Sequence, residues 1–295
     1  MQERVPCCRK AAGNGPLNGG WRPSSIRTMR RTIAIVNQKG GVGKSTTAVN
    51  LGASLALLGT RVLVCDLDPQ ANATSGLGIP KPSASASTYG VLIEGRALSA
   101  AVVSTAVSGL SLLPSSPHLA GAEVELVPML SRELRLREAL ERGADGYEVI
   151  LLDCPPSLGL LTINALTAAT EVLIPIQCEY YALEGLSQLL DSVTLVQRYL
   201  NPALDISGVL LTMFDARTRL SEQVAVEVRR FFKDKVYEAV IPRSIRLAEA
   251  PGYGMPVMLF DPSSRGTDAY MHLAKEVMTR GRDGGLGQLP AANRG

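Results

Sequence analysis

Ile33-Ala-Ile-Val-Asn-Gln-Lys-Gly-Gly-Val-Gly-Lys-Ser-Thr-Thr47 joins a short apolar run to a glycine-rich segment and the beginning of a helical pattern. This order predicts a buried strand, a loop and a helix. Such a loop points several backbone N–H groups into one concavity, and the helix N-terminus adds partial positive charge. Gly40, Gly41 and Gly43 let the backbone approach an anion closely and adopt positive φ angles. The stretch therefore predicts a phosphate-binding loop.

Two lysines and a serine supply the expected chemistry of this loop. Lys44 provides a cation for the β- and γ-phosphates of a nucleotide, and the Ser45 hydroxyl is placed to hold Mg²⁺. Lys39 stands at the front of the loop, and Gln38 occupies a position where the general pattern requires glycine. The alternative is a glycine-rich turn with two solvated lysines. The fixed positions of the motif are matched, and they lie between a predicted strand and a predicted helix, which argues against that alternative. The residues of this loop expected to bind the nucleotide are Lys39, Gly40, Gly41, Val42, Gly43, Lys44, Ser45 and Thr46.

The composition sets limits on the class of protein. A chain of 295 residues with 46% hydrophobic content can bury a full core. No apolar run is long enough to span a bilayer, and the N-terminus lacks the apolar segment of a signal peptide. The five cysteines are scattered without CxxC spacing, which favours reduced thiols in a cytoplasm over a disulfide framework or a zinc site. The net charge of +3 is too small to indicate a nucleic-acid partner by itself.

The two ends of the chain differ in composition from its middle. Residues 1–29 are rich in Gly, Pro, Arg and Asn, so we expect a disordered basic extension, with a DNA-contacting arm as the alternative. Residues 281–295 are again rich in glycine and are expected to form a disordered tail. Residues 30–280 are expected to fold as a single domain around the phosphate-binding loop.

Five near-continuous apolar runs alternate with helical patterns along this domain. Runs of this kind belong to parallel strands that are covered on both faces. The alternation predicts an α/β fold, with a doubly wound, mostly parallel sheet flanked by helices on both faces. In such sheets ligands bind beyond the carboxyl ends of the strands. The expected strands are residues 33–36, 62–65, 149–152, 172–176 and 209–213.

The second motif is Val62-Leu-Val-Cys-Asp-Leu-Asp-Pro-Gln70, in which a buried strand delivers two carboxylates beside the phosphate site. Phosphoryl transfer to water needs an attacking water held in line, and we expect Asp68 to orient it. Asp66 is expected to organise Mg²⁺ and its waters. Pro69 fixes the backbone beside the nucleotide. The alternative is that both carboxylates only cap the turn. The following small residues, 71–78, are expected to act as a switch segment.

The third motif is Tyr147-Glu-Val-Ile-Leu-Leu-Asp-Cys-Pro-Pro-Ser157, a buried strand that ends in Asp153. This carboxylate can hold Mg²⁺ through water, because Mg²⁺ keeps several of its waters in protein sites. Cys154 follows it, but no general base is in evidence nearby, so a nucleophilic cysteine is not expected.

Together the three motifs resemble those of the ParA/MinD family, whose deviant Walker A loop reads Lys-Gly-Gly-x-Gly-Lys-[Ser/Thr]. From about Arg31 to Arg280 the chain is similar to ParA/Soj-type partition ATPases, and residues 211–220 and 240–251 are similar to the Soj branch in particular. The resemblance implies a P-loop ATPase domain that uses ATP and Mg²⁺, with Lys39, Lys44 and Asp68 as catalytic residues. It also implies that two ATP-bound monomers pair face to face. Lys39 would reach the partner's phosphates, and Gly40 would lie where the two subunits approach closely.

The resemblance further implies the partners. The ATP-dependent homodimer is expected to bind double-stranded DNA without sequence preference, and a ParB/Spo0J-type centromere-binding protein is expected to stimulate hydrolysis and release it. The protein is then cytoplasmic and associated with the nucleoid. Whether the cargo is a chromosome or a plasmid stays open. A physical argument for Lys39 acting across a dimer stands beside the resemblance, because a cation from a second subunit can stabilise transferring phosphate.

Basic residues in the last third are the candidates for DNA contact. Residues 221–235 predict an amphipathic helix with Val224, Val228, Phe231 and Phe232 as its apolar stripe, and its basic face is equally consistent with ordinary solvation. Contacts to phosphate would be salt-dependent and indifferent to sequence. An apolar slot for adenine is expected near Met213 and Pro242, at the ends of adjacent strands. The expected DNA-binding residues are Arg217, Arg219, Arg243 and Arg246.

Three other classes of protein share the fold. A MinD-like membrane-associated ATPase needs an amphipathic C-terminal helix, which the glycine-rich residues 281–295 do not predict, so we expect no membrane binding. An iron–sulfur relative needs cluster-ligating cysteines, and neither Cys65 nor Cys154 is placed as one. A metabolic synthetase would need a dedicated polar substrate pocket, for which the sequence shows no candidate.

Overall fold

The computed structural model describes residues 30–180 and 185–280. The predicted basic extension (1–29) and the predicted tail (281–295) lie outside the described residues. Among the helices that are described, none combines the length and the apolar character needed to cross a membrane.

An eight-stranded sheet runs through the centre of the molecule in the order β3-β4-β2-β5-β1-β6-β7-β8. All neighbouring strands in it are parallel except the β3–β4 pair. The predicted doubly wound, mostly parallel sheet is therefore confirmed, and all five expected strands are present. The strands are β1 (Arg31–Ile35), β2 (Val62–Asp66), β3 (Val103–Ser104), β4 (Leu110–Leu113), β5 (Val149–Asp153), β6 (Glu171–Gln177), β7 (Asp205–Phe214) and β8 (Val236–Pro242).

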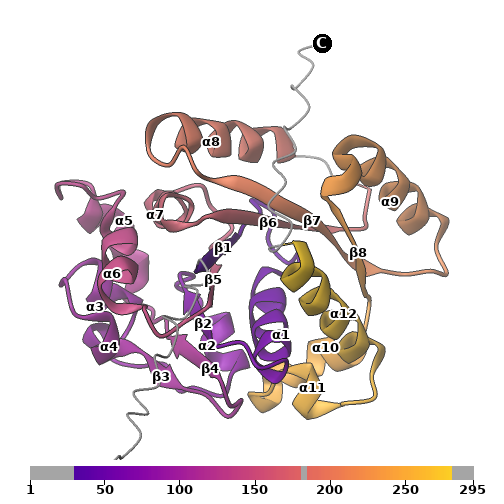
Figure 1. Cartoon of the computed structure of the whole chain (residues 1–295), viewed down its shortest axis with the longest axis horizontal. Coiled ribbons are helices and arrows are strands. Elements are labelled where there is room, and N and C mark those ends of the chain that lie inside the picture. Colours follow the sequence, from indigo (N-terminus) through magenta and orange to yellow (C-terminus); the bar gives the residue numbers. More distant parts are fainter. Residues whose placement is uncertain (1–29, 181–184, 281–295) are drawn as a thin grey trace, which may run out of the picture.

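Helices cover both faces of this sheet (Figure 1). On one face lie α1 (Lys44–Leu57), α10 (Ile245–Glu249), α11 (Val257–Phe260) and α12 (Arg265–Arg280). The opposite face is covered by α3 (Thr88–Leu92), α5 (Leu119–Leu126), α6 (Arg135–Gly143), α7 (Leu160–Ala168), α8 (Leu186–Tyr199) and α9 (Arg219–Phe232). The short helices α2 (Asn72–Gly76) and α4 (Leu98–Ala101) complete the set of described helices.

The strands are apolar throughout because each face of the sheet contributes to a separate core. In β1, Ile33 and Ile35 pack into the core under α1 and α12, whereas Ala34 packs into the core under α7 and α8. Successive side chains of a strand point to opposite faces, so a strand buried on both sides shows no polar alternation. This arrangement fixes the carboxyl ends of β1, β2 and β5 side by side.

The helix predicted over residues 221–235 is present as α9, with different bounds and a narrower apolar stripe. Val224, Val228 and Phe232 are buried, as expected, but Phe231 is 44% exposed. The prediction that Phe231 belongs to the buried stripe is wrong, because consecutive residues on a helix are about 100° apart and cannot share a narrow face. The helix ends at Phe232, and a 3-10 turn follows it.

The C-terminal helix is tied to the strand and helix that flank the phosphate-binding loop. Thr47 on α1 and Tyr270 on α12 bring their hydroxyl oxygens within 3.2 Å in a buried contact. Arg31, at the start of β1, donates two hydrogen bonds of 2.6 Å to Glu171 on β6. These contacts hold β1 and α1, and with them the loop between them, in a fixed frame.

Candidate nucleotide-binding site

A cavity of about 610 Å³ lies at the carboxyl edge of the sheet, beside the phosphate-binding loop. Residues from five segments meet there: the segments that follow β1, β2 and β5, the end of β7, and residues 251–255 after α10. Its lining residues are Gly40, Gly41, Gly43, Lys44, Ser45, Thr46, Val49, Asn50, Asp68, Gln70, Asn72, Ser75, Gly76, Pro156, Met213, Pro251, Gly252 and Met255. The volume lies in the range of small-molecule and cofactor sites.

The three glycines of the loop are present for different reasons. Gly41 has a φ of +75° and Gly43 has a φ of +88°, a region that side chains rarely adopt. Gly43 is the N-cap of α1, whose first helical residue is Lys44. Gly40 has no positive φ, and a Cβ built on it meets nothing within 4 Å. Nothing inside the described chain therefore requires glycine at position 40.

The Lys44 side chain is folded over the loop. It is 6% exposed, and its Nζ donates a hydrogen bond of 3.0 Å to the carbonyl oxygen of Lys39. Burial lowers the pKa of Lys44, and the nearby carboxylates of Asp153 and Asp68 act against that effect. The ammonium group is thus held at the cavity by the loop itself.

The backbone of Lys39 is anchored, whereas its side chain is not. The Lys39 N–H donates to Oδ1 of Asn37 over 3.0 Å, and the Asn37 amide donates in turn to the Pro175 carbonyl over 2.7 Å. The side chain of Lys39 is half-buried and forms no ion pair with any residue in the described ranges 30–180 and 185–280.

The two carboxylates of the second motif have separate surroundings. Asp68 lines the cavity, and its Oδ1 accepts a hydrogen bond of 2.9 Å from the Gln70 N–H. Asp66 is fully buried, and it accepts hydrogen bonds from the backbone of Asp68 and from Thr74. Burial raises the pKa of Asp66 to about 6, although those donors oppose the shift. Its predicted part in organising Mg²⁺ stays a prediction, because both oxygens already have protein donors.

Asp153 ends β5 directly beside Asp66, its partner in the parallel register. Both of its carboxylate oxygens are buried, and neither accepts a hydrogen bond by geometry from a donor within residues 30–180 and 185–280, although the Ser45 hydroxyl lies close by. Burial raises the pKa of Asp153 well above its ordinary value, the Asp66 charge adds to this, and the Ser45 hydroxyl and Lys44 oppose it. A buried carboxylate without donors has a large desolvation cost unless a cation or its waters satisfy it. Asp153 and the Ser45 hydroxyl therefore fit Mg²⁺, which takes most of its ligands from water and phosphate.

Sequence comparisons place the chain among known proteins. A family model described as an AAA domain matches residues 30–206. The chain is 58% identical over 253 residues to "Sporulation initiation inhibitor protein Soj" of Bacillus subtilis. The aligned region covers 86% of this chain and 100% of the relative. It is 50% identical over 272 residues to "Chromosome partitioning protein ParA" of Myxococcus xanthus, covering 92% of this chain and 94% of that one. The chain belongs to the Soj/ParA family of partitioning ATPases.

Solved structures agree on the fold of this Soj/ParA chain. A Mycobacterium smegmatis protein described as cobyrinic acid a,c-diamide synthase, with a bound ATP analog and magnesium, has a TM-score of 0.77 and 38% identity, over 87% of this chain and 97% of that one. The septum site-determining protein MinD of Pyrococcus horikoshii, complexed with Mg-ADP, has a TM-score of 0.66 and 27% identity, over 84% and 96%. The higher identity to Soj and ParA favours partitioning over the MinD-like alternative.

Of the two residues predicted to form an adenine slot, Met213 lines the cavity and Pro242 does not. Met213 lines the cavity, and its φ of +51° is an unusual backbone conformation at the end of β7. Pro69, Pro242 and the side chains of Lys39 and Val42 are not among the residues that line the cavity. Its apolar wall instead includes Pro251 and Met255, which the sequence reading did not assign. Pro251 ends the second stretch that is similar to Soj sequences, but that similarity does not by itself place the residue at the cavity.

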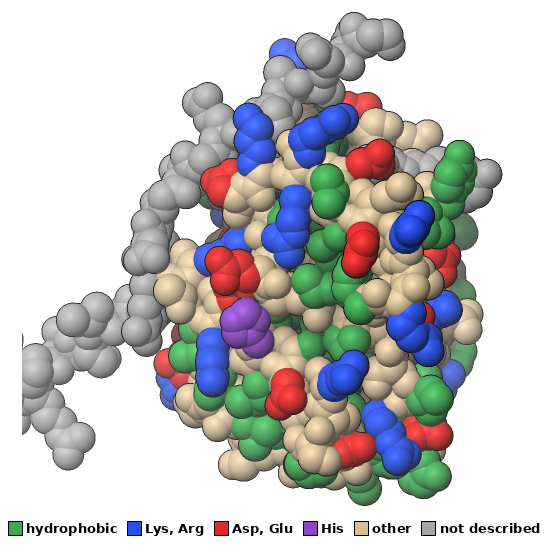
Figure 2. All heavy atoms as spheres, turned by 90° about the vertical axis from the view of Figure 1, so that its right-hand side faces the viewer, with side chains coloured by type: hydrophobic (Ala, Val, Ile, Leu, Met, Phe, Trp, Pro, Cys, Tyr) green, Lys and Arg blue, Asp and Glu red, His purple; other side chains and the backbone are tan. Residues whose placement is uncertain are grey.

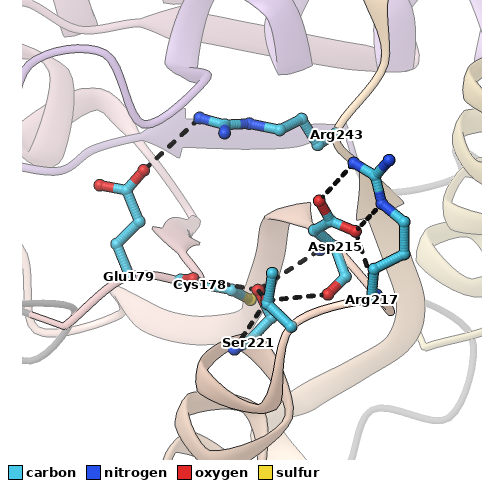
Figure 3. A network of polar contacts seen from close by, with 7 residues as sticks. Cys178, Glu179, Asp215, Arg217, Ser221 and Arg243 are labelled. Atoms are coloured by element: carbon cyan, nitrogen blue, oxygen red, sulfur yellow. Dashed lines mark hydrogen bonds and ion pairs between the residues drawn. The ribbon is translucent and has the colours of Figure 1, made fainter.

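The four arginines predicted to contact DNA all come from segments that follow β7 and β8. Arg217 is 87% exposed in its side chain and clasps Asp215, Arg243 faces Glu179, and Arg246 pairs with Glu249 and Asp261. Arg219 is exposed at the start of α9. Figure 3 shows the Arg217–Asp215 fork and Arg243 extending toward Glu179 above the start of α9.

The surrounding surface is mixed in charge. Figure 2 shows the face on the α9 and α12 side, where Lys and Arg side chains alternate with Asp and Glu side chains. The basic side chains on this face are scattered among acidic ones. Three of the four predicted arginines are themselves paired with carboxylates of the same chain.

Proposed function

We propose that the protein is a chromosome-partitioning ATPase in which ATP binding is converted into dimerisation and then into DNA binding. The observation that carries this is the cavity lined by the phosphate-binding loop and Asp68, with Asp153 buried close to Lys44 and Ser45 and without a hydrogen-bond donor among the described residues. The names of its relatives, chromosome partitioning protein among them, favour a chromosome over a plasmid as the cargo. The site of action is then the cytoplasm, on the nucleoid.

The residues at the cavity have different roles in ATP binding and hydrolysis. The loop N–H groups and the buried ammonium of Lys44 hold the β- and γ-phosphates, and Asp68 orients the attacking water. The Ser45 hydroxyl, and Asp153 through water, would hold Mg²⁺, which would supply positive charge next to the phosphates. Met213, Pro251 and Met255 offer apolar surface to the adenine. The site has no strong general base, so turnover without a partner protein is expected to be slow.

Two features support a dimer in which the nucleotides lie between the subunits. The Lys39 ammonium has no carboxylate partner within the described residues, so it is available to a second subunit's phosphates. Gly40 is exposed at the cavity mouth, and neither its φ angle nor its neighbours within the chain require glycine. A close approach by a second backbone explains both, and the approach would be tightest with γ-phosphate present.

Size-exclusion chromatography with light scattering tests this dimer. Wild type is expected to be monomeric with ADP and dimeric with ATP and Mg²⁺. Asp68→Ala is expected to remain a dimer with ATP for longer, because it binds the nucleotide without hydrolysing it. Lys39→Ala is expected to stay monomeric with ATP. A monomeric Asp68→Ala protein in ATP would disprove the nucleotide-sandwich arrangement.

The DNA-binding surface in this proposal consists of Arg217, Arg219, Arg243 and Arg246. The segments that carry Arg217 and Arg243 are adjacent, since β7 and β8 pair and Arg243 N–H bonds to the Phe214 carbonyl over 2.9 Å. A dimer would present two such sets and double the number of phosphate contacts. Binding of this kind falls steeply with added salt and is indifferent to sequence.

Charge reversal tests the surface with a matched control. Arg217→Glu combined with Arg246→Glu should abolish binding of the ATP-bound protein to random-sequence duplex DNA. Arg137→Glu with Arg142→Glu makes the same charge change on the exposed face of α6, on another side of the molecule, and should weaken binding only slightly. Equal losses in the two double variants would show that net charge, and not this surface, controls binding.

A centromere-binding protein of the ParB/Spo0J type completes the cycle by stimulating hydrolysis and so releasing the dimer from DNA. The measurement is the ATPase rate with a purified protein of the ParB/Spo0J type, with and without DNA. A rate that the partner does not change would remove this step from the proposal.

A further inference from the structure

A buried ring of hydrogen bonds surrounds the backbone of Asp68. Oδ1 of Asp66 accepts from the Asp68 N–H over 3.1 Å, and the Ser115 hydroxyl donates to the Asp68 carbonyl oxygen over 2.7 Å. The Asp68 backbone is thus held at both its donor and its acceptor. Ser115 belongs to the segment that follows β4, 47 residues further along the chain.

Thr74 closes the ring between these two groups. Its hydroxyl donates to Oδ2 of Asp66 over 2.6 Å, and the Ser115 N–H donates to the same hydroxyl oxygen over 2.9 Å. Asp66, Thr74 and Ser115 are all 0% exposed. The ring is therefore shielded from bulk solvent, and each of its hydrogen bonds constrains the next.

The ring leaves the carboxylate of Asp68 pointing at the cavity. Its Oδ1 accepts from the Gln70 N–H, and Asp68 is the only member of the ring that lines the cavity in the described part of the chain. With the backbone clamped on both sides, the carboxylate has few ways to move relative to the phosphate-binding loop.

We propose that Ser115, acting with Thr74, is a positioning residue for hydrolysis: its hydroxyl holds the Asp68 backbone where the carboxylate can orient the attacking water. The inference rests on the proposed role of Asp68. A misplacement of a catalytic group by about 1 Å can cost roughly a hundredfold in rate. Losing one of two backbone clamps should cost less than losing the carboxylate.

Steady-state ATPase kinetics of Ser115→Ala test the proposal. We expect kcat to fall roughly tenfold with the KM for ATP unchanged, because the water and not the nucleotide is misplaced. The ATP-bound dimer should also persist longer than that of wild type, which is a milder form of the behaviour expected of Asp68→Ala. A merely structural role would lower nucleotide affinity and shorten the life of the dimer instead.

Ser116→Ala is the matched control. Ser116 is the next residue and is equally buried, but its hydroxyl meets the Ser87 hydroxyl at 3.1 Å and does not touch the ring. We expect its kcat to stay near that of wild type. A kcat for Ser115→Ala equal to that of Ser116→Ala would overturn the proposal.

Two substitutions of Thr74 keep the test decisive should Ser115→Ala fold poorly. Thr74→Ser retains the hydroxyl and should hydrolyse ATP at nearly the wild-type rate, whereas Thr74→Val removes it at similar volume and should lower kcat. Equal rates for these two variants would overturn the proposal. Asp68→Ala is measured in parallel: if it too hydrolyses normally, the role of Asp68 itself is wrong, and if it alone is inactive, only the positioning role fails.

Discussion

The guanidinium of Arg243 lies 3.7 Å from Oε1 of Glu179, so an arginine predicted to contact DNA already faces a carboxylate of its own chain. That carboxylate is itself held by Gln177, whose amide donates to it over 2.6 Å. Both side chains of the ion pair are substantially exposed, so the attraction between them is modest. A DNA phosphate that binds Arg243 must compete with Glu179.

Replacing Glu179 should therefore strengthen DNA binding. We expect Glu179→Gln to bind random-sequence duplex about two- to fivefold more tightly in ATP, since an exposed pair contributes up to about 1 kcal/mol. Fluorescence anisotropy with labelled DNA measures this. Glu141→Gln, which removes the same charge from the Arg137 pair on α6, is the control. Equal gains in both variants would mean that overall charge is responsible.

Gly40 and Gly41 should respond differently to the same substitution. Gly40→Ala should fold and melt like wild type, because the added Cβ meets nothing within 4 Å and the φ angle is not positive. It should nevertheless lose the ATP-dependent dimer, since the methyl group fills the space proposed for a second backbone.

Gly41→Ala is the comparison, because its φ of +75° makes any side chain strained, by about 1–2 kcal/mol. Its melting temperature and ATP affinity should both fall. Differential scanning fluorimetry and light scattering together separate the two cases. A Gly40→Ala protein that dimerises normally in ATP would place the subunit contact elsewhere.

Asp153→Asn should raise the thermal stability of the protein and lower its ATPase rate. In the nucleotide-free protein at neutral pH, the substitution removes a buried carboxylate that has no donor, so the melting temperature should rise. ATP hydrolysis in Mg²⁺ should fall by roughly ten- to a hundredfold, because the cation loses a charged neighbour that orients its waters. Thermal melts without nucleotide and Mg²⁺ titrations of the ATPase rate measure the two effects. A variant that is less stable and fully active would contradict both.

The Arg217–Asp215 pair predicts a pH dependence. Arg217 donates to the two carboxylate oxygens of Asp215 over 2.9 and 2.7 Å, and these bonds hold the pKa of Asp215 at about 2, below its ordinary 3.8. Since the folded pKa is lower than the unfolded one, the contribution to stability is present above the ordinary carboxyl range. It is lost as the pH falls toward about 2.

Carboxyl NMR during acid titration checks this shift. In wild type the Asp215 signal should hardly move as the pH falls from neutral to about 4, where an ordinary carboxyl is half titrated. In Arg217→Ala the same signal should begin to titrate in that range. Arg219→Ala, which changes a neighbouring arginine outside the pair, should behave like wild type. An Asp215 pKa that Arg217→Ala leaves unchanged would rule out the pair as its cause.

Local patterns in the sequence predicted most of the sheet. The five long apolar runs were visible because parallel strands buried on both faces are continuous in hydrophobicity. The strand β4, which lies between β3 and β2, was not predicted, since its four residues include Ser111 and carry no recognisable period. β3 has only two residues and pairs antiparallel to β4, so it depends on a neighbour that was itself missed.

The functional site likewise contains residues that the sequence could place and residues that it could not. The phosphate-binding loop, Asp68 and Asp153 could be placed from the sequence, because each stands at the end of an apolar run and such ends meet at one edge of a parallel sheet. Pro251 and Met255 could not be placed at the site from the sequence, because they reach the cavity from a segment near the C-terminus that packs against α2. Pro242 ends a strand as expected but does not line the cavity.

The sequence by itself determined the loop at residues 38–45, because a strand, three glycines, two lysines and a helix start prescribe a backbone conformation within a few residues. The tertiary structure alone decided which distant side chains complete it. Ser115 reaches the Asp68 carbonyl only because β4 pairs with β2, and Glu179 reaches Arg243 only because β7 lies between β6 and β8. Strand order is a property of the whole core, so no short stretch of sequence contains it.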